Sequence, residues 1–234
     1  LLSEFMLQQT QVKTVIPYFY KIIKEYKSLK SFSKISEKNI LKLWEGLGYY
    51  TRARNLLACS KILVKKYNSK LPNTFDELKK LPGVGNYTAN ALLAFVHNQP
   101  TIAIDGNVKR VFGRYLNKNE SEIEFEKLFF IKKKIYPINR NSDFAEALIE
   151  FGALICKPKD PKCFNCCLNK SCLYLKSPKK TKKIKRKKIK TMNCDIFCYV
   201  NKNKQIALTK KNEISFLKNF NLPMIKKMKD KPKN

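Results

Sequence analysis

The sequence predicts an all-α domain over residues 1–175, followed by a basic linker at 176–190 and an incomplete β segment at 191–234. Two observations support this division. Apolar residues recur at helical spacing through the first part, whereas strand-like alternation appears only after residue 175. A run of Lys and Arg separates these two parts, and its composition suits either a solvated tether or a segment that lies along phosphates.

The composition favours a globular protein with a polyanionic partner. Hydrophobic residues make up 44% of the 234 residues, and 49 Lys and Arg against 18 acidic residues give a formal charge of +31. Such a charge points to nucleic acid as the partner. The chain is also rich in Lys, Asn, Ile, Phe and Tyr, whose codons are A/T-rich, so drift in an A/T-rich genome also raises the lysine content. No segment has the length of a transmembrane span, and no signal peptide is visible. We expect a monomer that binds DNA and does not enter a membrane.

The helical part opens with an apolar helix over residues 1–9, which starts without a leading Met or a cap, so we expect that the natural N-terminus is missing. Thr10 is expected to cap a second helix, which Pro17 kinks. Ser36 begins a capped amphipathic helix that Gly46 ends. Further helices are expected at 50–67, 106–116, 122–135 and 142–155.

A glycine hairpin stands between two helical stretches in the middle of the chain. Its sequence is Leu-Pro-Gly-Val-Gly at 81–85, with an amphipathic stretch at 75–80 and an Ala-rich apolar stretch at 88–96. Glycines permit positive φ angles and the close approach of an anion, and the start of the second helix directs backbone N–H groups outward. The pattern predicts a helix-hairpin-helix that grips a DNA phosphate without reading sequence.

Two carboxylates lie in apolar surroundings. Glu4 belongs to the apolar first helix; helix statistics alone favour an exposed position, and the alternative is a carboxyl group held for chemistry. Asp105 follows an apolar stretch and precedes a helix, so it is expected to cap that helix, which also fixes its carboxylate. Two carboxyl groups in different environments can divide the protonation of a leaving base and the stabilisation of a cationic sugar.

Four cysteines form the pattern Cys156-x6-Cys163-x2-Cys166-x5-Cys172. Four thiolates suit a [4Fe–4S] cluster or a structural zinc ion, and the number of cysteines alone leaves the two comparable. Zinc sites usually pair two Cys-x2-Cys units, and only one is present here. The spacing, beside the hairpin, therefore favours one [4Fe–4S] cluster.

Two short segments are expected to face DNA. Residues 8–11 are a polar cluster on an otherwise apolar stretch, and residues 46–50 form a glycine-flanked apolar and aromatic tip. Such tips can wedge between base pairs when a base is extruded. Core packing is the alternative for Tyr49 and Tyr50.

In combination, these motifs resemble the adenine DNA glycosylase (MutY) family of the endonuclease III-like superfamily, over residues 1 to about 175. The residues that carry the resemblance are 3–12, 46–56, 81–85, 104–110 and the four cysteines. The resemblance implies a bacterial, cytoplasmic, nucleoid-associated and monofunctional enzyme. It would remove adenine mispaired with 8-oxoguanine or guanine in double-stranded DNA.

The resemblance also implies roles for individual residues. Glu4 would be the general acid that protonates adenine N7 and later handles water, and Asp105 would stabilise the cationic sugar. The extruded adenine would be lined by Tyr87, Leu7 and Glu146. The 8-oxoguanine side would be contacted by Gln9, Thr10, Leu47 and Tyr49. The DNA backbone would be held by Gly83, Val84 and Gly85, and the cluster by Cys156, Cys163, Cys166 and Cys172.

Two other functions stay open at this point. Endonuclease III-like lyases share the hairpin, the aspartate and the cluster, but their nucleophilic lysine falls at Tyr87 here, which leaves no obvious amine for a Schiff base. A catalytically inactive DNA-binding remnant is the second alternative. We expect that the family's first helical segment is missing before Leu1, and that its C-terminal Nudix-like domain is cut short after two expected strands at 194–200 and 205–208.

Overall fold

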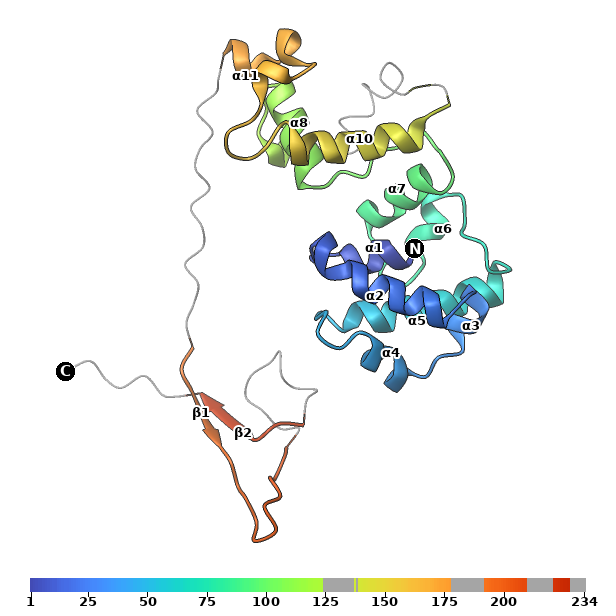
Figure 1. Cartoon of the computed structure of the whole chain (residues 1–234), viewed down its shortest axis with the longest axis vertical. Helices are drawn as coiled ribbons and strands as arrows, with labels where there is room; N and C mark the ends of the chain where they lie inside the picture. Colours follow the sequence, from blue (N-terminus) through green and yellow to red (C-terminus); the bar gives the residue numbers. More distant parts are fainter. Residues whose placement is uncertain (124–136, 138, 178–191, 210–220, 228–234) are drawn as a thin grey trace, which may run out of the picture. The chain divides into compact units, whose positions relative to one another are not determined.

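The computed structural model describes residues 1–123, 137, 139–177, 192–209 and 221–227. The chain divides into two compact units, Leu1–Thr181 and Lys182–Asn234. The first unit is helical, and the described strands lie in the second (Figure 1). No helix among the described residues is long and apolar enough to cross a membrane.

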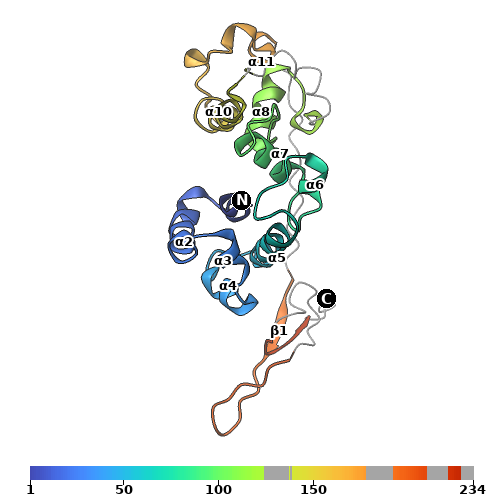
Figure 2. The ribbon, with the colours of Figure 1, turned by 90° about the vertical axis from the view of Figure 1, so that its right-hand side faces the viewer.

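The elements of the first unit follow one another with short connections. The α-helices are α1 (Leu2–Leu7), α2 (Val12–Glu25), α3 (Leu29–Ser33), α4 (Glu37–Leu43), α5 (Thr51–Lys66), α6 (Phe75–Lys79), α7 (Asn86–Phe95), α8 (Gly106–Tyr115), α10 (Asn141–Leu154) and α11 (Leu173–Lys176). Three 3-10 turns complete the unit, namely η1 (Glu120–Glu122), η2 (Cys163–Asn165) and η3 (Asn169–Ser171). Helices α8, α10 and α11 gather at one end of the unit, while α1 to α6 form the other end (Figures 1 and 2).

The helix boundaries follow the expected capping chemistry with local differences. The Ser36 hydroxyl accepts a hydrogen bond from the Asn39 N–H at 3.2 Å, which confirms the predicted cap of α4. That helix ends at Leu43, before the predicted Gly46, and the N-cap position of α2 is held by Gln11, whose side chain makes no capping hydrogen bond, instead of by Thr10. Helix α2 continues through Pro17. The helix predicted at 122–135 falls mainly outside the described residues.

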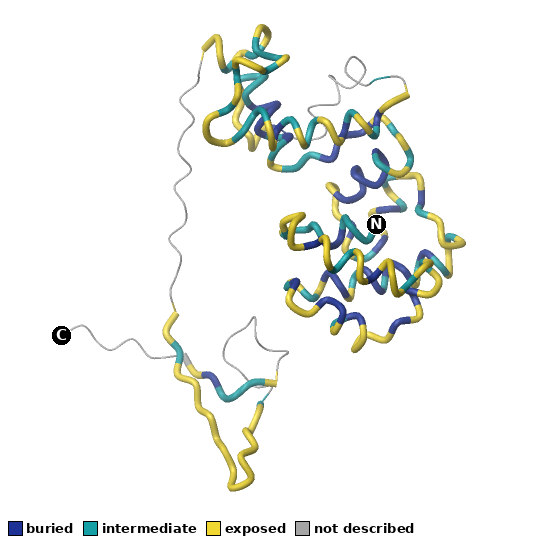
Figure 3. Tube along the Cα trace, viewed as in Figure 1, coloured by how far each residue is buried: buried dark blue, intermediate teal, exposed yellow. Residues whose placement is uncertain are grey.

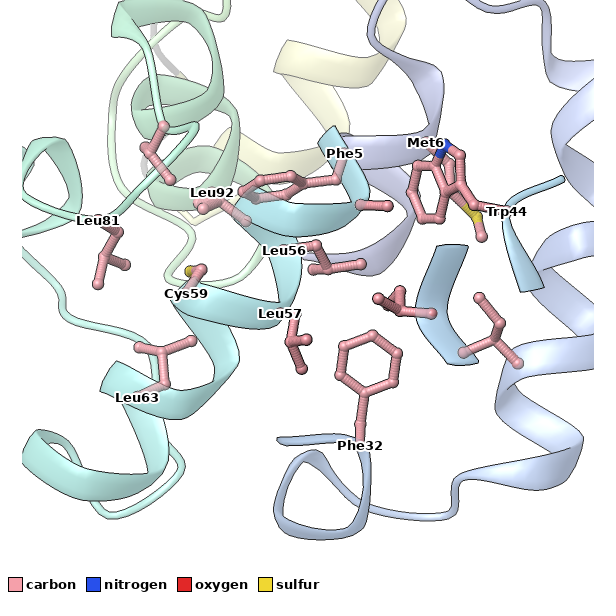
Figure 4. Packing of buried hydrophobic residues seen from close by; sticks show 14 of the residues in the cluster. Phe5, Met6, Phe32, Trp44, Leu56, Leu57, Cys59, Leu63, Leu81 and Leu92 are labelled. Atoms are coloured by element: carbon pink, nitrogen blue, oxygen red, sulfur yellow. The ribbon is translucent and has the colours of Figure 1, made fainter. Parts of the chain in front are cut away.

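A large apolar core joins α1 to α7. Buried side chains from different helices meet in it, among them Phe5 of α1, Leu56 of α5 and Leu92 of α7 (Figure 4). Burial follows the inner faces of these helices, while their outer faces are exposed (Figure 3). Helix α1 has six residues and would be marginal in isolation, so this packing is what stabilises it.

A smaller core lies at the other end of the unit. Buried Ile102, Val108 and Phe112 pack with Ile123, and side chains of α10 cover them. Helix α10 contacts both α8 and α7. It therefore connects the end of the unit that holds the cysteine loop with the hairpin helix.

The second unit contains a two-stranded antiparallel sheet. Strand β1 (Cys194–Phe197) pairs with β2 (Met224–Lys227), with Cys194 opposite Lys227. The predicted strands at 194–200 and 205–208 meet antiparallel only near their turn, through the bridge between Val200 and Ile206 and the hydrogen bond from the Ala207 N–H to the Tyr199 carbonyl at 2.9 Å, whereas β1 itself pairs with β2. A distant segment supplies the partner strand, which periodicity within one stretch does not reveal.

Candidate active site and DNA-facing surface

Glu4 lies in the middle of α1, next to two fully buried side chains. Phe5 and Met6 anchor the helix in the core, and Glu4 itself is half-buried. Burial raises the pKa of the Glu4 carboxyl above its ordinary value. The exposed position that helix statistics favoured is therefore wrong. A carboxyl group with a raised pKa keeps its proton closer to neutral pH.

Asp105 is the N-cap of α8, as predicted. Its Oδ1 accepts a hydrogen bond from the Val108 N–H at 2.7 Å, and its Oδ2 accepts one from Asn107 Nδ2 at 2.9 Å. Arg110 extends this arrangement, because its Nη2 donates to Asn107 Oδ1 at 2.8 Å and its Nε donates to the Cys156 carbonyl at 2.8 Å. The carboxylate is thus fixed on both oxygens and connected to the start of the cysteine loop.

Tyr87 lies within electrostatic reach of both carboxylates. It is the second residue of α7 and lies at the protein surface. Desolvation raises the pKa of its hydroxyl, and the charges of Glu4 and Asp105 raise it further. Two carboxyl groups that are far apart in the sequence therefore act on one side chain beside the hairpin.

The hairpin has the geometry of an anion site. Gly83 adopts φ +77°. Gly85 is the N-cap residue of α7, and because it has no side chain, no side-chain acceptor binds the N–H groups at the start of the helix. Free N–H groups at a helix start bind phosphates well. Gln8 ties the end of α1 to this region, since its Nε2 lies 3.3 Å from the Gly83 carbonyl and 3.4 Å from Thr88 Oγ1. Val84 is buried, and it anchors the hairpin in the core.

The 46–50 loop presents one aromatic ring to solvent. Gly46 and Gly48 have φ of +88° and +75°, and Tyr49 has φ +50° with 62% of the residue exposed. Leu47 is only 5% exposed and belongs to the core, so the expectation of an exposed Leu47 is wrong. The left-handed turns direct the chain so that Leu47 packs inward and Tyr49 faces outward.

The other predicted contact residues lie on α1 and α10. Gln9 is exposed with φ +57°, and Thr10 beside it is half-buried. Leu7 is half-buried at the last position of α1. Glu146 is exposed on α10, a helix that packs against α7 and α8. Their roles stay predictions.

The four predicted cysteine ligands line one shared cavity. Helices α8, α10 and α11 supply its other walls, and Arg114 of α8 donates from Nη1 to Cys156 Sγ at 3.3 Å. All eight cysteines are free thiols. Within the described part of the chain, no three His, Cys, Asp or Glu side chains come together closely enough to hold a single metal ion. Four thiols around one cavity form a donor set that suits a [4Fe–4S] cluster or a zinc ion.

The interpretation of the sequence missed three arginines that support the site. Arg52, Arg110 and Arg114 each donate to two or more backbone carbonyls. A signal was present, since only six of the 49 basic residues are arginine. Three of these six arginines hold backbone carbonyls through the planar fork of donors that lysine lacks.

Known proteins similar to this chain perform base excision repair. Residues 2–133 match the HhH-GPD superfamily of base excision DNA repair proteins. An adenine DNA glycosylase of Buchnera aphidicola subsp. Baizongia pistaciae is 48% identical over 172 residues, which are 73% of this chain and 49% of that protein. Another from Buchnera aphidicola subsp. Schizaphis graminum is 37% identical over 229 residues, 94% of this chain and 65% of that protein.

A solved structure has the same fold. It is a non-covalent endonuclease III–DNA complex with a TM-score of 0.64 and 27% identity, covering 75% of this chain and 82% of that one. The chain spans about half the length of the first of the two curated relatives. The match over residues 2–133 shows that the chain belongs to the HhH-GPD superfamily of base excision DNA repair proteins, and the two relatives confirm its resemblance to the adenine DNA glycosylases.

Proposed function

We propose that this protein is a monofunctional adenine DNA glycosylase that releases adenine paired with 8-oxoguanine or guanine in duplex DNA. The observation that carries the proposal is the pairing of a half-buried Glu4 with an Asp105 carboxylate fixed at the start of α8, whose charges both raise the pKa of Tyr87 beside the hairpin. The resemblance to adenine DNA glycosylases supports the choice of base. The relation to a DNA-bound endonuclease III structure supports the partner.

The two carboxyl groups divide the chemistry. Glu4, whose pKa burial shifts in favour of the protonated form, donates a proton to adenine N7. The bond between C1′ and N9 then breaks, its electron pair leaves with the base, and the sugar becomes cationic. Asp105 stabilises this cation with a carboxylate that donors on both oxygens hold in place. Water adds to C1′, and its proton restores the Glu4 carboxyl.

Surface residues would hold the duplex around this centre. The hairpin at 83–85 would bind a phosphate through its backbone. Tyr87, Leu7 and Glu146 would line the extruded adenine. Gln9, Thr10 and Tyr49 would face the opposite base, with the exposed Tyr49 ring as the wedge. Leu47 would act from beneath the loop, as a support for Tyr49.

Cys156, Cys163, Cys166 and Cys172 would hold one [4Fe–4S] cluster in the cavity that they share. The cluster would supply no step of base release and would instead order the loop that carries Lys157, Lys159 and Lys162. Residues 176–190 would be a linker, and residues 191–234 would belong to a Nudix-like segment. We expect the protein to act in the bacterial cytoplasm, on nucleoid DNA.

A single-turnover assay tests the proposal. Duplexes with adenine opposite 8-oxoguanine, guanine or thymine are incubated with excess protein, and released adenine is measured. Release from the first two and not from the third is expected. Release of another base, or none, would contradict the function.

Borohydride trapping in the same reactions separates the lyase alternative, which the endonuclease III-like fold favours. A lyase forms a Schiff base with an amine, and borohydride reduces it to a stable covalent complex. We expect no such complex, because Tyr87 stands where the lyases have their lysine.

A further inference from the structure

Arg52 makes an unusual set of contacts at the start of α5. It is only 6% exposed, and its guanidinium donates exclusively to backbone carbonyls in the described hydrogen bonds. No carboxylate of the described residues pairs with it. A buried cation in this position is expensive unless its donors are satisfied by many acceptors. Such a residue needs an explanation beyond surface charge.

One nitrogen of Arg52 caps α1. Nη1 donates to the carbonyls of Phe5 at 3.2 Å and Gln8 at 2.6 Å, and also to that of Met6. The last carbonyls of a helix have no partner within it, and α1 ends at Leu7 with Gln8, not a glycine, at its C-cap. A cation from a distant helix therefore satisfies the end of the short helix that carries Glu4.

The other nitrogen holds the 46–50 loop. Nη2 donates to the carbonyls of Leu47 at 3.3 Å and Gly48 at 3.1 Å. The Arg52 guanidinium carbon also lies 5.4 Å from the centre of the Tyr49 ring and 5.6 Å from that of Trp44. The exposed Tyr49 and the buried Trp44 thus share one cation between them.

We propose that Arg52 is a positioning residue for base release, which locks the helix that carries Glu4 to the loop that carries Tyr49. Among the described residues, no other side chain donates hydrogen bonds to both segments. A lysine at this position would keep the charge but lose the planar fork that reaches two segments at once. The inference rests on the proposed function, because it assigns the acid and the wedge to these two segments.

The test compares Arg52 with a matched arginine on the same helix. Arg54 makes an exposed ion pair with Glu37 at 2.7 Å, so Arg54→Lys and Arg54→Met are the controls for Arg52→Lys and Arg52→Met. We expect Arg52→Lys to lower the single-turnover rate constant of adenine release by about tenfold, and Arg52→Met by more, because small displacements of an acid are costly. The affinity of the Arg52 variants for a duplex with a non-hydrolysable adenine analogue should stay within about threefold of the parent's affinity. The Arg54 variants should stay within about twofold of the parent in both the rate constant and the affinity.

Chemical rescue distinguishes positioning from general support of the fold. Methylguanidinium added to Arg52→Ala should restore part of the rate, whereas methylammonium at the same concentration should not, because only the former presents a planar fork. Equal rescue by both cations would overturn the role of the fork. A rate loss in Arg52→Lys that merely follows the folded fraction, measured by urea unfolding, would overturn the positioning role.

Amide hydrogen exchange tests the link between α1 and the 46–50 loop without using the proposed function. Arg52→Lys should accelerate exchange at the end of α1 and in the 46–50 loop, and leave the later turns of α5 unchanged. If the parent releases no adenine, the proposed function fails while exchange still tests the link. If adenine is released but Arg52→Lys keeps the parental rate within about twofold and the parental exchange, the inference about Arg52 is wrong.

Discussion

Gly83→Ala should destabilise the helical unit, although the substitution adds only one methyl group. Gly83 has φ +77°, in the left-handed region that disfavours residues with a Cβ. A Cβ built there would lie 2.7 Å from Phe5 Cε1 and 2.8 Å from Asn55 Cβ. Phe5 is fully buried, and a Cβ atom cannot swing away, so the backbone of the hairpin has to shift.

The size of the effect follows from these two terms. The left-handed backbone contributes about 1–2 kcal/mol, and overpacking a filled site contributes about 1–3 kcal/mol. Their sum predicts a loss of about 3 kcal/mol in the free energy of unfolding. For a helical unit of this size the corresponding fall in Tm is about 10 °C.

Gly85→Ala is the matched control in the same hairpin. Gly85 has extended backbone, with φ −88° and ψ −178°, and nothing lies within 4 Å of the position of its Cβ. We expect its free energy of unfolding to change by less than about 1 kcal/mol. It should nevertheless weaken binding to any duplex, because the new methyl group would hold a phosphate away from the start of α7.

Urea unfolding followed by far-UV circular dichroism measures both variants, since the described helices all lie in the first unit. Fluorescence anisotropy with a labelled duplex then measures DNA binding. Equal stabilities for the two variants, within about 0.5 kcal/mol, would refute the steric reasoning at Gly83. Unchanged DNA affinity in Gly85→Ala would refute the backbone contact.

Three further changes test the chemistry of the site. Glu4→Gln should abolish adenine release with little loss of DNA binding. Because burial raises the Glu4 pKa above 4.5, the parent loses stability as the pH rises through the folded pKa. The Glu4→Gln variant should therefore be more stable than the parent at neutral pH, and this difference should vanish toward pH 4.5. A pH-independent difference in urea unfolding would contradict this reasoning. Cys163→Ser should lower the iron content and the visible absorbance, and stoichiometric zinc in the parent would contradict the cluster. Tyr87→Lys should permit weak borohydride trapping on substrate DNA, and trapping of the parent would contradict a monofunctional enzyme.

Local patterns in the sequence predicted several elements of the helical unit correctly. The serine before α4 and the aspartate before α8 both cap their helices, because an N-cap depends on a side chain and the backbone within three residues of it. The Gly-Val-Gly hairpin at 83–85 likewise depends on glycines that permit a positive φ at Gly83. Such features are fixed by neighbours in the chain.

Long-range partners could not be predicted in this way. Leu47 has the same local pattern as an exposed apolar tip, yet the turn at Gly48 and the core beneath it bury the side chain. Strand β1 pairs with β2 and not with the nearer 205–208, since pairing energy depends on which segment reaches the edge. The role of Arg52 depends on carbonyls more than forty residues away.

The sequence by itself therefore determined the order of the helices, the hairpin, the cysteine spacing and the two carboxylates, because each is a matter of local propensity or residue type. Only the tertiary structure decided that Glu4 is desolvated, that the charges of Glu4 and Asp105 both raise the pKa of Tyr87, and that Arg52 ties α1 to the 46–50 loop. The pKa of a group depends on the groups that surround it. Whether a helix end is capped by a distant donor depends on which side chain reaches its carbonyls. Both follow from how the helices pack, which the order of residues along one helix does not specify.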